Sequence, residues 1–159
     1  MLEREAGVLR FMQGYGDDLL ADIDPGSMCA CPVRGMNHPA WIVGHLAFAA
    51  DGHSAEAGGV AQLDDWHERF GYGSQLTEEP AAYPSKPELV DAWHAANERL
   101  IVAATSADEA TLAKPTRGPL AASLPTVGDF LAFSMTGHTS LHLGQLSAWR
   151  RASGRGTLF

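Results

Sequence analysis

The sequence has only two cysteines, and their spacing limits what they can build. Cys29 and Cys31 are separated by one residue. This spacing rarely forms an unstrained disulfide, and it supplies only half of a typical thiolate metal site. A redox-active thiol pair is the alternative, but Arg34 is the only basic residue nearby in the sequence that could lower a thiol pKa. We therefore expect two reduced thiols in a loop.

Basic residues and long apolar runs are also lacking. The chain has 11 Lys and Arg against 19 Asp and Glu, which gives a formal net charge of −8. Such a chain repels phosphate backbones, which argues against nucleic acid as a partner. The charged residues Glu3, Arg4 and Glu5 interrupt the start of the chain, and no later run has the length of a membrane span. The sequence predicts a cytoplasmic protein with a small-molecule substrate and no membrane partner.

The sequence contains enough hydrophobic residues to form one core. Hydrophobic residues make up 45% of the 159 residues and charged residues 19%, which is ordinary for a globular chain. This length suits one domain with one sizeable core and is short for two. We expect a single domain that spans residues 1–159.

Four stretches repeat apolar residues at steps of three and four, which is the spacing of amphipathic helices. Proline, glycine and capping residues mark their ends, while the pattern of the second stretch dissolves near residue 51. The four stretches are residues 2–23, 39–51, 86–106 and 126–151. Without an alternating strand pattern, this predicts an all-α four-helix bundle with a long loop between the second and third helices. Both an up-down-up-down and a crossover topology remain open.

Three histidines fall on the apolar faces of the second and fourth predicted helices. The stretch GHTSLHLGQL places His138 and His142 four residues apart on a predicted stripe that also carries Gln145 and Trp149, and His45 shares a face with Trp41. Burying an imidazole without a hydrogen bond costs about 1–3 kcal/mol.

A divalent ion would satisfy all three rings, because two histidines at i and i+4 can bind one ion together with a third from a facing helix. Three protein ligands leave open positions, as in catalytic sites. Ordinary hydrogen-bonded core histidines are the alternative. If imidazoles are the ligands, metal affinity should weaken between about pH 7 and 5.5, because their unperturbed pKa is near 6.5.

The other polar residues on or near these helices are less favoured as metal ligands. His53 lies two turns beyond His45 and could face the same groove, where we expect a structural hydrogen bond rather than ligation. Asp51 is expected in the second shell of the site. Surface or helix-capping roles are expected for the other histidines, which are His38, His67 and His94.

Two segments together carry a family resemblance. NHPAWIVGHLAFAADGH (residues 37–53) and LPTVGDFLAFSMTGHTSLHLGQLSAWRRASG (residues 124–154) resemble the DinB-like (DinB/YfiT) superfamily of metal-binding four-helix bundles. Carried over by position, the metal triad of that family becomes His45, His138 and His142, with zinc or nickel as the ion. Many relatives have Glu directly after the first histidine of the last motif, whereas this chain has Thr139. A mechanism that needs a carboxylate base at that position therefore loses support.

The resemblance implies an activity as well as a metal site. Characterised relatives include S-transferases that use a low-molecular-weight thiol such as bacillithiol or mycothiol. The resemblance also allows a homodimer of this chain. We therefore expect a metal-dependent transferase whose electrophile enters beneath the loop at residues 58–84. Trp41 and Trp149 would wall the substrate pocket, and Gln145 would hydrogen-bond a bound group. The alternatives are a non-catalytic metal or small-ligand binding module and a bundle that acts by association with a protein partner.

Overall fold

The structure, a computed structural model, describes residues 1–158. Short helical turns connect four long helical stretches, and the described residues contain no β-strand. The long stretches are α1 (Glu3–Leu20), α2 (Pro39–Glu56), α4 (Lys86–Ser106), and α6 (Val127–Phe133) continued by η4 (Ser134–His138) and α7 (Thr139–Ala152). The short turns are η1 (Pro25–Ser27), η2 (Asp64–Trp66), α3 (His67–Phe70), η3 (Pro80–Ala82) and α5 (Glu109–Leu112). The predicted all-α helical bundle is confirmed.

The starts of the long helices follow from their capping residues. Ser85 and Thr126 each open a capping box, in which the hydroxyl accepts a backbone N–H and the acid three residues later binds back. His38 caps α2, where its Nδ1 accepts the N–H of Trp41 at 3.1 Å. The end of α2 was predicted too early. The helix continues past Asp51 to Glu56, because Asp51 and Ser54 in its last turns are buried and hydrogen-bonded instead of being exposed in a loop.

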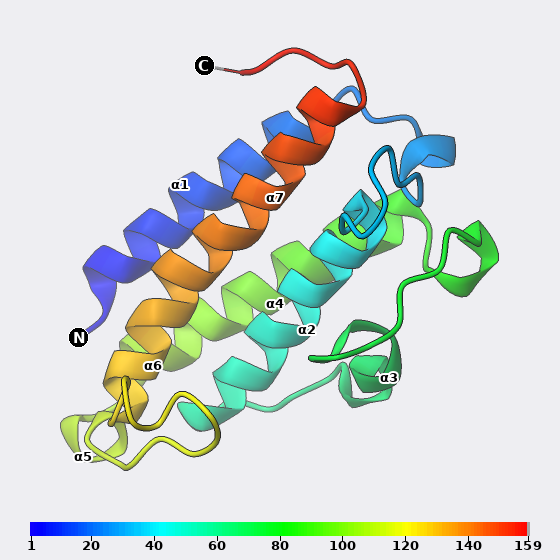
Figure 1. The fold of residues 1–159 in the computed structure, drawn as a ribbon. Helices are drawn as coiled ribbons and strands as arrows, with labels where there is room; N and C mark the ends of the chain where they lie inside the picture. Colours follow the sequence, from blue (N-terminus) through cyan, green and yellow to red (C-terminus); the bar gives the residue numbers. More distant parts are fainter. Residues whose placement is uncertain (159) are drawn as a thin grey trace.

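The bundle has a crossover topology. In Figure 1, α1 and α7 run side by side in one direction, while α2 and α4 run side by side in the other. Two hydrogen bonds agree with this arrangement: Arg150, near the end of α7, donates to the carbonyl of Leu19 near the end of α1 at 2.7 Å, and the amino group of Met1 donates to the carbonyl of Thr105 at the end of α4. Residues 57–85, the crossover segment, therefore return along the bundle before α4 begins.

A π-helical turn interrupts the last long helix. This turn, η4, lies between α6 and α7, and the hydroxyl of Thr139 donates to the carbonyl of Ser134 at 3.0 Å across it. A wider turn changes the direction in which the side chains after it point. Trp149 is fully buried, whereas His138 and His142 are half-buried and Gln145 is exposed. The prediction of one continuous buried stripe through these residues is wrong, because the two histidines lie at the edge of the core.

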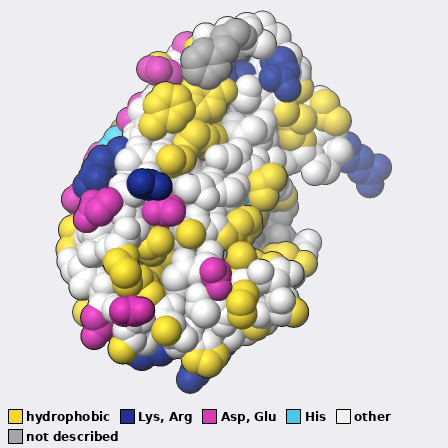
Figure 2. Space-filling view, turned by 90° about the vertical axis from the view of Figure 1, so that its left-hand side faces the viewer, with side chains coloured by type: hydrophobic (Ala, Val, Ile, Leu, Met, Phe, Trp, Pro, Cys, Tyr) yellow, Lys and Arg dark blue, Asp and Glu magenta, His cyan; other side chains and the backbone are white. Residues whose placement is uncertain are grey.

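The core fills the space between the four long helices. Its largest fully buried side chains include Trp93, Trp149 and Phe70, which belong to one apolar cluster, while Leu100, Leu131 and neighbouring residues form a second. Figure 2 shows one face of the molecule, on which apolar side chains are interspersed with acidic and basic ones. Within the described residues, no helix is long and apolar enough to cross a membrane.

Candidate metal centre

Three histidine rings meet where α2 packs against the last long helix. His45 comes from α2, His138 ends the π-turn and His142 lies one turn into α7. The Nε2 atoms of His45 and His138 are 3.2 Å apart. The ring of His142 is centred 4.5 Å from that of His45 and 4.6 Å from that of His138. One nitrogen from each ring fits into a group whose members all lie within 4.8 Å of one another.

This geometry fits a divalent metal ion. Two nitrogen ligands about 2.0–2.1 Å from a tetrahedral zinc ion lie about 3.3 Å apart, close to the 3.2 Å between the Nε2 atoms of His45 and His138. In addition, Nδ1 of His142 is buried and has no hydrogen-bond partner, which is costly for a polar atom. The cluster of His45, His138 and His142 could therefore hold a metal ion.

Burial keeps the three rings in the neutral form that binds metals. Desolvation, followed by repulsion from neighbouring imidazoles, lowers the pKa of His138 to about 3 and the pKa of His142 to about 3. Desolvation also lowers the pKa of His45. Because a metal ligand must present an unprotonated nitrogen, these shifts leave the cluster ready to bind at neutral pH.

A backbone carbonyl fixes the orientation of His45. Nδ1 of His45 lies 2.7 Å from the carbonyl oxygen of Phe70. A carbonyl can only accept a hydrogen bond, so this Nδ1 carries the proton and Nε2 directs its lone pair toward His138. Partners of this kind orient metal-binding imidazoles. Sequence reasoning missed Phe70, because a carbonyl 25 residues away leaves no signal in residue types.

The structure brings two of the three predicted pocket residues to the cluster. The ring of Trp41 stacks on His45 with centroids 4.7 Å apart and an angle of 7°. Gln145 lies near enough to His142 to act against the lowering of its pKa, and its Oε1 accepts from the side-chain amide of Asn37 at 2.9 Å. Trp149 lies further along α7 in the core, where its Nε1 donates to the carbonyl of Ala30 at 2.7 Å.

The predicted second-shell residue, Asp51, has other partners. One carboxylate oxygen accepts from Arg99 at 2.5 and 3.1 Å, and the other accepts the backbone N–H groups of Gln62 and Leu63 at 2.7 and 2.8 Å. The hydrogen-bonding partner found for His45 is Phe70 rather than this carboxylate. Asp51 thus ties the start of the crossover segment to α2 and α4.

His53 lies beside the cluster and makes the structural hydrogen bond that we expected. Its Nδ1 is 2.6 Å from the hydroxyl of Ser134, and its ring is centred 5.8 Å from that of His138. Burial lowers its pKa to about 4. The hydroxyl of Thr139, at the position where many relatives carry Glu, is directed back to the π-turn. The hydroxyl of Thr139 is therefore engaged in a hydrogen bond within its own helix.

The remaining predicted residues lie elsewhere. Cys29 is buried and Cys31 half-buried, both as free thiols, and burial raises the pKa of each, so neither is an activated thiolate. His67 packs on the ring of Phe48. The remaining candidate, His94, pairs with Asp17 at 2.8 Å.

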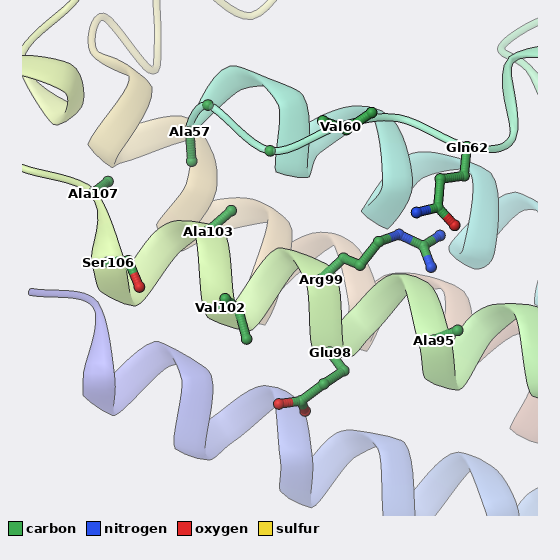
Figure 3. A pocket seen from close by; sticks show the side chains of 12 residues that line it. Ala57, Val60, Gln62, Ala95, Glu98, Arg99, Val102, Ala103, Ser106 and Ala107 are labelled. Atoms are coloured by element: carbon green, nitrogen blue, oxygen red, sulfur yellow. The ribbon is translucent and has the colours of Figure 1, made fainter.

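Two cavities lie outside the histidine cluster. The larger, about 660 Å³, lies between α4 and the chain just after α2, and Figure 3 shows Gln62 and Arg99 directed toward each other at one end of it. The three histidines are not among its lining residues. The smaller, about 380 Å³, is lined by Gln145, Asn37, Arg34 and neighbouring residues. Because Gln145 also lies near His142, the smaller cavity adjoins the cluster.

Comparison with protein families agrees with the observed fold. No protein with curated annotation matches the sequence. The model of the DinB superfamily matches residues 9–146, a range that includes all three histidines of the cluster. The chain therefore belongs to the DinB superfamily.

Proposed function

We propose that this protein is a metal-dependent transferase that activates a low-molecular-weight thiol. His45, His138 and His142 would hold one zinc or nickel ion. The observation that carries the proposal is the pair of Nε2 atoms 3.2 Å apart beside the third ring. All three rings are neutral at pH 7 because burial lowers their pKa values. Zinc and nickel both accept an all-imidazole ligand set.

The ion and the protein would have separate roles in the reaction. A bound divalent ion lowers the pKa of a coordinated thiol, so that a thiolate is available at neutral pH. The chain's own residues position and shield the reactants. Trp41 covers one side of His45 and keeps water from that ring. Gln145, whose Oε1 accepts from Asn37, can offer its amide N–H groups to a polar group of the substrate.

Substrates would approach from the side of Gln145. The cavity of about 380 Å³ there is lined by Arg34, Asn37 and Gln145, and Gln145 is its link to His142. Entry beneath residues 58–84, which the sequence suggested, would require displacing a segment that hydrogen-bonds α2 through Asp51, His45 and Trp41. The cavity is therefore the favoured route.

Elemental analysis and a turnover assay test the proposal in two steps. Purified protein should contain one divalent ion per chain, and His142→Ala should contain almost none. The metal-loaded protein should then consume a thiol (cysteine, glutathione, bacillithiol or mycothiol) with a chloro-aromatic or an epoxide as the electrophile. Full metal content in His142→Ala would contradict the site. Stoichiometric metal without turnover of any of these pairs would contradict the transferase and favour a non-catalytic binding module.

A further inference from the structure

The crossover segment is attached to α2 by a row of polar contacts. The carboxylate of Asp51 accepts two backbone N–H groups at residues 62 and 63, and His45 donates to the carbonyl of Phe70. Further along, Nε1 of Trp41 donates to the hydroxyl of Ser74 at 2.8 Å. The partners advance along the crossover segment as the contacts move back along α2. One of these contacts is made by a residue of the histidine cluster.

The contact at His45 depends on how the ring of Phe70 is held. This ring is fully buried and packs against Trp66 and Tyr83, with ring centroids 4.9 and 5.9 Å away. It lies directly over Gly44 of α2, where a Cβ atom would overlap three of its ring carbons. Only glycine leaves room for the ring at this position. Gly44 therefore forms a notch next to His45 in the sequence.

We infer that the crossover segment is a functional part of the metal centre, because the notch at Gly44 seats Phe70 so that its carbonyl positions His45. The inference rests on the proposed metal site. It identifies the backbone of Phe70 as a positioning group and Gly44 as the residue that makes its approach possible.

The physical consequence is coupling between the crossover segment and the metal. A seated Phe70 holds the proton of His45 on Nδ1 and leaves Nε2 free to bind the ion. When the segment detaches, the proton can move to Nε2 and the ring can rotate, so a larger share of molecules must rearrange before binding. By reciprocity, a bound ion must also hold the crossover segment in place.

Glycine substitutions on α2 test this coupling. Zinc affinity is measured by chelator competition for the wild type, Gly44→Ala and Gly52→Ala. Gly52 is the matched control, because it lies on the same helix with no atom within 4 Å of an added Cβ. We expect Gly44→Ala to bind zinc about 10–100-fold more weakly, the usual effect of losing an outer-shell partner, and Gly52→Ala to stay within about 2-fold of the wild type. Equal affinities of folded Gly44→Ala and Gly52→Ala would overturn the inference.

Phe70→Ala is a second test of the inference. It removes the ring without introducing a steric overlap and leaves the backbone carbonyl of residue 70 in place. With the ring gone, the segment is no longer seated, so we again expect weaker zinc binding. Amide hydrogen exchange across residues 62–74 should slow on zinc binding in the wild type and in Gly52→Ala, but less in Phe70→Ala. Zinc affinity and exchange in Phe70→Ala equal to those of the wild type would contradict the inference, even if Gly44→Ala does not fold.

The tautomer of His45 separates this inference from the proposed function. Nitrogen NMR of the metal-free wild type should show the proton on Nδ1, whereas Gly44→Ala should show a shift of population toward Nε2. A wild-type ring protonated on Nε2 would overturn the inference whatever the zinc result. Absence of zinc binding by the wild type would instead refute the proposed function, since the tautomer can be measured without metal.

Discussion

Two polar clusters to which α2 contributes differ in how their hydrogen bonds are satisfied. The carboxylate of Asp51 is almost fully buried, yet both of its oxygens accept two hydrogen bonds each, and Arg99 supplies the opposite charge. His45 of the histidine cluster lies about two turns away on the same helix. There, the Nε2 atoms of two rings face each other and Nδ1 of His142 is buried without a partner.

The difference distinguishes groups that hold the fold from groups that await a ligand. Buried polar atoms in folded proteins are nearly always hydrogen-bonded, because an unpaired one costs about 1–3 kcal/mol. The partners of Asp51 all come from the chain itself, so its contribution is to stability. In the cluster of His45, His138 and His142, by contrast, Nδ1 of His142 has no partner in the chain, and a ligand from outside the chain could supply one. The two clusters should therefore respond differently to substitution.

The largest effect is expected from removing a ring of the cluster. His45→Ala should abolish metal binding and, with it, thiol transfer, because two imidazoles on one helix hold an ion far more weakly than three. The free energy of unfolding of the metal-free protein should fall by only about 1 kcal/mol, the cost of losing the hydrogen bond from Nδ1 of His45 to the carbonyl of Phe70. Elemental analysis and denaturant unfolding give the two numbers. Metal retained at one ion per chain would show that His45 is not a ligand.

Substituting Asp51 should give the opposite pattern. Asp51→Asn keeps the shape but loses the charge that faces Arg99, so we expect the free energy of unfolding to fall by about 1.5–3 kcal/mol, with metal content unchanged. The rate of transfer should fall by less than the roughly 100-fold expected for loss of a general base. Asp91→Asn, at an exposed position on α4, is the matched control. A variant that keeps its metal but loses transfer by several orders of magnitude would identify Asp51 as the base.

The parts of the fold that the sequence predicted are those that local patterns encode. Apolar spacing and capping boxes at Ser85 and Thr126 lie within short stretches, and they gave the helices and most of their ends. The crossover direction was not predictable, because loop length allowed either topology. The end of α2 was misjudged because Asp51 looks like an exposed loop residue until its partners, which are 11 and 12 residues and 48 residues away, are known.

The candidate site was predictable as a set of residue types but not as an arrangement. Histidines at i and i+4, with a third on another helix, marked the cluster. Two features left no local signal: the carbonyl of Phe70 that orients His45, and the π-turn before Thr139 that moves His138 and His142 to the edge of the core. Backbone groups and helix irregularities arise from tertiary packing, so residue types alone do not reveal them.

The pH dependence of stability should also separate the two clusters. The pKa of His138 falls from 6.5 to about 3 on folding, so between these values the unfolded chain binds a proton that the folded chain does not. The metal-free protein must therefore lose stability as the pH falls below 6.5, by up to about 2 kcal/mol from this ring at pH 5. Denaturant unfolding at pH 7 and 5 should show a smaller loss in His138→Gln. An equal loss in both proteins would contradict the lowered pKa.

The same shifts change the expected pH range of metal binding. The sequence suggested weakening between pH 7 and 5.5 from unperturbed imidazoles. With the pKa values of His138 and His142 at about 3, protons compete for these two nitrogens only at lower pH. Zinc affinity should therefore be nearly constant from pH 7 to 5.5. A steep fall in that range would mean that the folded, metal-free rings are protonated more easily than their burial implies.

The smallest effect is expected where the crossover segment touches the cluster only indirectly. Ser74→Ala removes the hydroxyl that accepts from Nε1 of Trp41, at a cost of about 1 kcal/mol in the free energy of unfolding. Trp41 still stacks on His45, so loss of the hydroxyl should alter zinc affinity by less than about 3-fold. The exposed neighbour Gln75 supplies a control, Gln75→Ala, with no effect on either quantity. A loss of zinc affinity in Ser74→Ala as large as that in Gly44→Ala would mean that the whole crossover segment orients His45 through Trp41, rather than the single carbonyl of Phe70.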